Sequence, residues 1–215
     1  MASLTELLRA AKIDFRWNSA VTGWVVEHGR ICAAKIAVGD IEADEFVLAG
    51  GSWSPGMLSG LGLRLPMQAG KGYSVTLENP RFQPRVPAIF TEARIAVTPI
   101  GKTLRFGGTM ELSGINHVVR KERVRQITES VPKYYPDFRP DDFVGLQPWH
   151  GLRPVSPDGL PYIGRFANYS NLVAASGHAM LGVTLAPITG KLVAETISGR
   201  PPSVSLEVLQ PDRFA

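Results

Sequence analysis

Two short, continuously apolar segments that lead into glycine limit most strongly what this 215-residue chain can fold into. The first is residues 46–49, followed by Gly50 and Gly51, and the second is residues 172–175, followed by Gly177. Continuous apolar runs of this length are typical of fully buried strands of a parallel sheet. Because ligands bind beyond the carboxyl ends of such strands, both glycine loops are candidate ligand contacts.

The segment between these two runs has a different pattern. From Pro66 to about Gly108, strand patterns alternate with proline and glycine. Three of them suit an antiparallel sheet: residues 73–77, 94–98 and 104–107. A helix is predicted over residues 118–131 and is ended by Pro132, Pro136 and Pro140. Nothing in the chain itself identifies the sheet that residues 46–49 would join.

The two ends of the chain combine helices with short strands. A capping box of Ser3 and Glu6 opens a helix within residues 1–12. Strand patterns follow at residues 14–17, 21–27, 31–38 and 40–44. The last predicted helix covers about residues 185–198, with Pro187 in its first turn.

Composition excludes several classes of protein. The net charge of +4 would suit a protein that binds nucleic acid. The basic residues are scattered, however, and Glu122 interrupts the densest run at residues 120–125. The single cysteine, Cys32, rules out an intramolecular disulfide and suits a reducing compartment. No run approaches the roughly 20 apolar residues of a membrane span. We therefore expect a cytoplasmic protein that binds no nucleic acid, with loose membrane association left open.

Three motifs carry the candidate chemistry. In the first, Gly50 and Gly51 allow a ligand to approach the backbone, and Trp53 could cover an aromatic or sugar face. The alternative is a glycine turn with a packing tryptophan. In the second, Arg153 stands between Gly151 and Pro154 on a restrained backbone, and its planar fork suits a carboxylate. A structural arginine is the alternative.

The third motif, residues 176–184, opens the last helix. A strand, a glycine loop and a helix N-terminus present free N–H groups and a positive dipole end, which suit a negative charge. An ordinary strand-to-helix turn remains the alternative. His150 and His178 are expected to be structural, and Asp158 with Gly159 to form a turn. The sequence shows no clustered metal ligands, nucleophile elbow or phosphate-binding loop.

Together the three motifs resemble the D-amino-acid oxidase superfamily of FAD-dependent oxidoreductases. Within it the likeness is greatest to the small subunit of bacterial D-amino-acid dehydrogenases, and it runs from Ala43 to the end. The resemblance implies that Arg153 binds the substrate carboxylate and that Tyr73 lines the side-chain pocket. It also implies contacts to FAD from Gly50, Gly51, Trp53, Gly177, Met180, Leu181, Gly182, Val183 and Thr184.

The implied reaction oxidises the C–N bond of an amino acid by hydride transfer from its α-carbon to the flavin. The amine must be neutral, and no strong general base is required, which leaves orientation and electrostatics to the protein. D-amino acids are the leading substrates, ahead of sarcosine, glycine, proline derivatives and other secondary amines. Dehydrogenase and oxidase activity cannot be told apart from the sequence.

The implied fold class is α+β. Residues 1–55 and 147–215 would form the late strand-helix part of a truncated FAD-binding α/β domain, and residues 56–146 an antiparallel substrate-binding domain. The glycine fingerprint that holds the ADP half of FAD in the family is absent, so residues 46–49 and 172–175 should expose apolar edges. A separate chain with the missing part, or a homo-oligomer, would cover them. A non-catalytic domain that folds or oligomerises without FAD is the alternative.

Overall fold

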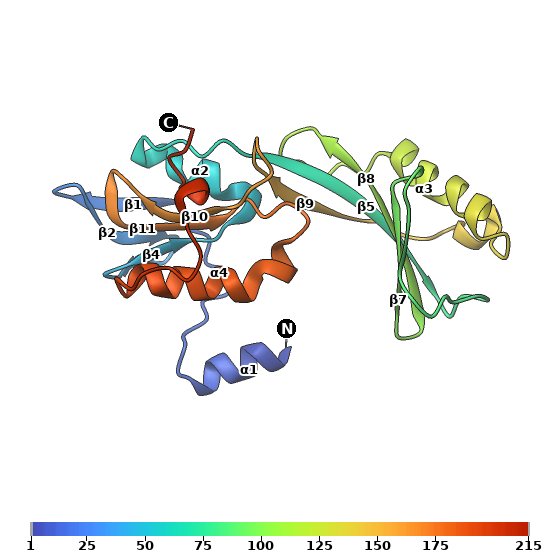
Figure 1. Ribbon diagram of the computed structural model, residues 1–215, viewed down its shortest axis with the longest axis horizontal. Coiled ribbons are helices and arrows are strands. Elements are labelled where there is room, and N and C mark those ends of the chain that lie inside the picture. The colour runs from blue at the N-terminus through green and yellow to red at the C-terminus, as the bar shows by residue number, and fades with distance from the viewer. Residues whose placement is uncertain (1, 215) are drawn as a thin grey trace.

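The computed structural model describes residues 2–214 as an elongated molecule in which two long strands join two sheet-containing regions (Figure 1). One region contains two three-stranded sheets, with strand orders β1-β2-β3 and β10-β11-β4. The other contains a five-stranded sheet with the order β6-β7-β8-β5-β9. This mixture of antiparallel sheets and helices confirms the expected α+β class.

The strands of the first region are short. They are β1 (Gly23–Glu27), β2 (Arg30–Ile36), β3 (Gly39–Glu42), β4 (Phe46–Leu48), β10 (Tyr162–Phe166) and β11 (Tyr169–Ser176). The two apolar runs of the sequence are direct neighbours here, because β4 pairs in parallel with β11. The sheet that residues 46–49 needed is therefore supplied by the second apolar run, about 125 residues later in the chain.

The expectation that both apolar runs are exposed is wrong for β11. That strand lies between β10 and β4, and Leu172, Val173 and Ala174 are completely buried. Of the two apolar runs, only β4 lies at an edge of this sheet, and the side chain of Val47 there remains 44% exposed. Residues 14–17, which were predicted to be a strand, form none; they connect the N-terminal helix to the first sheet.

Four α-helices are described: α1 (Ala2–Ala10), α2 (Ser54–Leu58), α3 (Lys121–Tyr134) and α4 (Gly182–Ile197). Four short 3-10 helices are η1 (Gly51–Trp53), η2 (Ser59–Leu61), η3 (Pro140–Phe143) and η4 (Glu207–Leu209). Two predictions about proline were wrong. Pro132 lies inside α3 and does not end it, because packing of the neighbouring Val131 in the core outweighs one lost backbone hydrogen bond. Pro187 lies beyond the first turn of α4, since the helix begins at Gly182.

The second region is built on long strands. They are β5 (Gln68–Glu78), β6 (Ala88–Phe90), β7 (Ile95–Ile100), β8 (Thr103–Leu112) and β9 (Trp149–Val155), all antiparallel to their neighbours. By pairing, β9 belongs to this sheet, although the predicted boundary at residue 147 assigns it to the other domain. The division into domains stays a prediction, with this strand shared between the two regions.

The two faces of the five-stranded sheet differ because side chains alternate along each strand. One face carries the apolar core, in which Val75, Val97 and Phe106 pack with Ile127 and Val131 of α3. The opposite face, here called the glycine face, carries Gly70, Gly72 and Ser74 of β5, Gly107 of β8 and Gly151 of β9. Because these positions lack side chains of any size, larger side chains of the same face lie close to the backbone there.

Candidate active site

The first and third motifs meet at the carboxyl ends of β4 and β11. Because these parallel strands are adjacent, their following loops leave the sheet at the same edge. The hydroxyl of Ser176 donates a hydrogen bond to the carbonyl of Gly51 at 3.2 Å, and the hydroxyl of Ser54 donates to Ser176 at 3.3 Å. The two glycine loops predicted from the sequence thus form one surface.

The second motif reaches the same surface through β9. The amide of Ala179 donates to the carbonyl of Pro154 at 2.9 Å, and His178 forms an isolated bridge with Val155. On the other side, the hydroxyl of Ser52 lies 3.5 Å from the carbonyl of Leu152. The loop after β4 and the loop after β11 therefore both contact β9 next to Arg153.

A cavity of about 470 Å³ opens beside Arg153. It is lined by Gly72, Tyr73, Ser74, Arg105, Gly107, Trp149, Gly151, Leu152, Arg153, Pro154 and Ala179. The lining combines the glycine face with the loop that follows β11. Sequence reasoning missed Ser74, Arg105 and Trp149, and the alternating glycines Gly70 and Gly72 together with Gly151 were the signal that could have found them.

Arg153 is held across the sheet with little to neutralise it. Its Nη1 lies 3.4 Å from the carbonyl of Thr109, a long hydrogen bond, and none of the described carboxylates forms an ion pair with it. Burial lowers the pKa of the Arg153 guanidinium, but an arginine remains cationic at any physiological pH. A half-buried, unpaired cation in a cavity is a ready site for a carboxylate.

The glycines of this face make room for the large side chains. A Cβ on Gly72 would overlap the guanidinium group of Arg153, and a Cβ on Gly151 would overlap the indole of Trp149. Both side chains consequently lie flat over a strand at positions where only glycine leaves space. The geometry of Arg153 thus depends on a neighbour in another strand.

Tyr73 points the other way. Its ring is 1% exposed in the apolar core, and its hydroxyl donates to Glu111 Oε2 at 2.8 Å. The residue borders the cavity, but its side chain lies on the opposite face of β5 from Gly72. Its role in lining the substrate pocket stays a prediction.

Behind the glycine face lies a buried charged cluster that the sequence did not reveal. Lys71 is completely buried and forms an ion pair with Glu111 at 3.3 Å. Hydrogen bonds from Ser113, Tyr73 and Lys71 hold the pKa of Glu111 at about 2, well below its usual range, against the opposing effect of burial. Lys71 also donates to Asn116 and to the carbonyl of Val118, so the cluster ties the segment after β8 to the sheet.

The residues expected to contact the flavin form an exposed apolar surface around the start of α4. The exposed fractions are 93% for Val183, 73% for Met180, 58% for Leu181 and 49% for Trp53. No side chain caps this helix, and the first N–H groups of any helix lack partners within it. Exposed apolar side chains beside unpaired donors fit a flat apolar ring with an electron-rich edge, as the flavin is.

Two of the expected contacts have distinct local roles. Gly177 has a positive φ of 82°, and a Cβ there would meet the ring of Tyr162, so this turn requires glycine. Trp53 lines a separate hollow of about 490 Å³ between β1 and α2, outside the lining of the Arg153 cavity. Ala179, in the loop before α4, lines the Arg153 cavity, whereas Trp53 does not.

The histidines have structural partners, as expected. His178 Nε2 lies 2.9 Å from the hydroxyl of Thr189, and burial lowers the pKa of the imidazole. His150 Nε2 lies 3.2 Å from His117 Nδ1. Asp158 occupies the predicted turn and is paired with Arg213, whose hydrogen bonds hold the pKa of the carboxyl at about 2.

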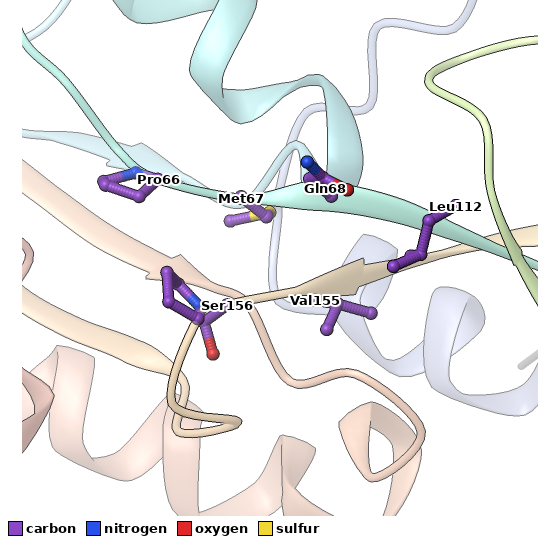
Figure 2. A pocket seen from close by; sticks show the side chains of 7 residues that line it. Pro66, Met67, Gln68, Leu112, Val155 and Ser156 are labelled. Carbon is purple, nitrogen blue, oxygen red and sulfur yellow. The ribbon is translucent and has the colours of Figure 1, made fainter.

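A further hollow of about 490 Å³ lies where β5 and β9 enter the second region (Figure 2). It is lined by Pro66, Met67, Gln68, Leu112, Val155, Ser156 and Pro157. None of these side chains is charged, and the Ser156 hydroxyl already donates to the carbonyl of Leu160. The cavity beside Arg153 is therefore the better candidate for a polar substrate.

Comparison with known proteins identifies the family. Residues 1–196 match the family model described as FAD dependent oxidoreductase, DAO. The chain belongs to this family. The D-amino acid dehydrogenases of Paramagnetospirillum magneticum and Xanthobacter autotrophicus are each 36% identical to it, over 98% and 99% of its length. Because only 50% and 51% of those two proteins are matched, the chain spans about half the length of these relatives.

Solved structures of the DAO family share the fold. Glycine oxidase from Geobacillus kaustophilus superposes with a TM-score of 0.86 at 23% identity, covering the whole of this chain and 57% of its own. Iminodiacetate oxidase from Chelativorans sp. BNC1 gives a TM-score of 0.85 at 23% identity, covering 98% and 57%. Among the described residues, no helix is long and apolar enough to cross a membrane, and no group of three or more metal-binding side chains is found.

Proposed function

We propose that this chain is the substrate-side part of an FAD-dependent oxidoreductase that oxidises the C–N bond of an amino acid, with D-amino acids as the first class to test. The observation that carries the proposal is Arg153, an unpaired, half-buried cation in a cavity that the loop before α4 also borders. The DAO family and the D-amino acid dehydrogenase relatives support this reading.

In this proposal the guanidinium of Arg153 binds the substrate carboxylate in a bidentate manner. Fixing the carboxylate fixes the position of the α-carbon, so the sheet orients the bond that reacts. The glycine face leaves room for the Arg153 guanidinium and the Trp149 indole to lie close to the backbone of β5 and β9, where they would line the substrate site. In the substrate-binding region, the protein supplies orientation and a positive potential.

FAD, when bound, supplies the acceptor for the substrate hydride. Gly182, Val183 and Thr184 would direct backbone N–H groups and the positive end of α4 at the electron-rich edge of the flavin. Met180 and Leu181 would cover its apolar ring. Gly50, Gly51 and Trp53 would lie beside the remainder of the cofactor.

A second candidate function is a domain that folds or oligomerises without FAD. It is supported by Val47 on the open edge of β4. Another chain that carries the remaining part of the FAD-binding domain, or a second copy, would cover this edge. A stable, colourless oligomer would favour this candidate.

The first experiment is a visible absorption spectrum of the purified chain with and without added FAD. Flavin bands that persist through gel filtration, and that bleach on anaerobic addition of a D-amino acid, are the expected result if the site is complete. A protein that stays colourless in excess FAD would place the activity in a longer chain or in a complex, and would favour the second candidate.

A further inference from the structure

A second arginine lines the same cavity as Arg153. In the β5–β8 pairing, Arg105 lies opposite Thr76 and Gly107 lies opposite Ser74, which puts Arg105 on the glycine face. Its side chain is exposed at the rim of the cavity and lies over the Trp149 ring, with the guanidinium carbon 5.9 Å from the ring centroid. The cavity thus carries one cation inside and one at its rim.

Neither cation is neutralised by the protein. Some other arginines within residues 2–214 do pair with carboxylates, as Arg165 does with Glu45 and Arg213 with Asp158. No described ion pair includes Arg105 or Arg153, and no carboxylate lines the cavity. A cleft lined by charges of one sign attracts ligands of the opposite sign.

The indole of Trp149 lies on the same face of the sheet as both guanidinium groups. The Arg153 guanidinium lies over Gly72, the Trp149 ring lies over Gly151, and these two glycines are direct partners across β5 and β9. Arg105 approaches the same ring from the β8 side. A ligand with a carboxylate at each end of a short carbon chain could pair one carboxylate with each arginine.

A buried hydroxyl lies in the same lining. Ser74 is 5% exposed, and its Oγ has no hydrogen-bond partner in the described part of the chain. An unpaired buried hydroxyl costs free energy, and such groups in native proteins call for an explanation. A polar ligand atom between the two arginines would satisfy it.

We propose that Arg105 binds a second carboxylate and that the site prefers an amino acid with an acidic side chain. The proposal rests on the function proposed above, in which Arg153 holds the α-carboxylate. Arg105 is then a specificity-determining residue, since it contacts the part of the substrate that distinguishes one amino acid from another. Ser74 completes the set as a hydrogen-bond donor to the same ligand.

The test is calorimetric binding of D-glutamate and D-glutamine to the full chain at low ionic strength, with FAD in excess. The two ligands have nearly the same shape and differ in the charge of the side chain. We expect D-glutamate to bind about tenfold more tightly, since hydrogen bonds to charged groups are stronger than neutral ones. Arg105→Gln should remove this difference and leave D-glutamine binding unchanged, and Arg105→Lys should retain part of it.

The matched control is Arg85→Gln, which removes an exposed arginine outside the cavity lining and should keep the preference. Equal affinities for the two ligands in the unmodified chain would overturn the role of Arg105 and leave that of Arg153 intact. D-glutamine binding that survives Arg153→Ala unchanged would overturn the proposed function itself. Failure of both ligands to bind would overturn both proposals.

Discussion

The guanidinium group of Arg153 lies directly over Gly72, at a place where any side-chain carbon would overlap it. The two residues are 81 positions apart and meet because β5 and β9 pair in antiparallel register. The cationic centre of the proposed substrate site therefore depends on a residue with no side chain.

Replacing Gly72 should weaken carboxylate binding and leave the stability of the fold almost unchanged. In Gly72→Ala, the flexible end of Arg153 can shift away from the new methyl group, so the unfolding free energy should change by about 1 kcal/mol or less. Carboxylate binding should fall at least tenfold, because the fork is displaced. Gly190→Ala on α4, where a Cβ meets nothing within 4 Å, is the control and should leave binding unchanged. Calorimetry and thermal unfolding measure the two effects.

Removing the cation should weaken amino-acid binding directly. Arg153→Ala deletes a charge-assisted hydrogen-bond pair, for which we expect a loss of roughly 1.5–3 kcal/mol in ligand binding free energy. Arg153→Lys keeps the charge and loses the planar fork, so its affinity for the amino acid should lie between that of the unmodified chain and that of Arg153→Ala. Titration with a D-amino acid checks this order, and an unchanged affinity in Arg153→Ala would remove the residue from the carboxylate role.

A negative charge at the start of α4 should expel FAD and spare the fold. Val183 is 93% exposed, and a carboxylate in the first turn of a helix is favourable to the helix. Val183→Glu should therefore keep the thermal stability of the chain, while flavin absorbance no longer co-elutes with it. Val208→Glu, at a 59% exposed valine outside the proposed contacts, should retain FAD to the same degree as the unmodified chain.

Breaking the buried Lys71–Glu111 ion pair should lower the unfolding free energy of the chain. Glu111→Gln leaves Lys71 buried without its carboxylate, which we expect to cost roughly 3 kcal/mol of unfolding free energy. Glu129→Gln removes an exposed carboxylate paired with Arg125 at 3.5 Å and should change stability by about 0.5 kcal/mol or less. Urea unfolding distinguishes the two variants, and equal midpoints would show that the buried pair contributes nothing.

The same carboxylate should make stability depend on acid pH. The pKa of Glu111 is lowered from 4.5 to about 2 in the folded chain, so the unfolded chain binds the proton more tightly. The stabilisation is complete above about pH 4.5 and is lost as the pH falls toward 2. Unfolding free energies measured between pH 6 and 3 should fall less steeply in Glu111→Gln, and identical slopes would contradict this assignment.

The sequence alone determined the local elements and the three motifs. Continuous apolar runs identified β4 and β11, alternating patterns identified β5, β7 and β8 of the antiparallel sheet but not β6 or β9, and glycine-rich loops marked the surface that they share. These features are visible because periodicity and turn chemistry act over a few residues. The family resemblance, and with it the expectation of FAD, came from motifs that are each continuous in the chain.

Only the tertiary structure decided which residues share the cavity. The pairing of β9 with β5 and of β5 with β8 sets Arg153, Trp149, Ser74 and Arg105 on one face, and directs Tyr73 to the other. A shift of one residue in either register would reverse these faces, and no pattern within a single strand fixes that register. The buried Lys71–Glu111 pair was hidden for the same reason, since its two partners lie on different strands.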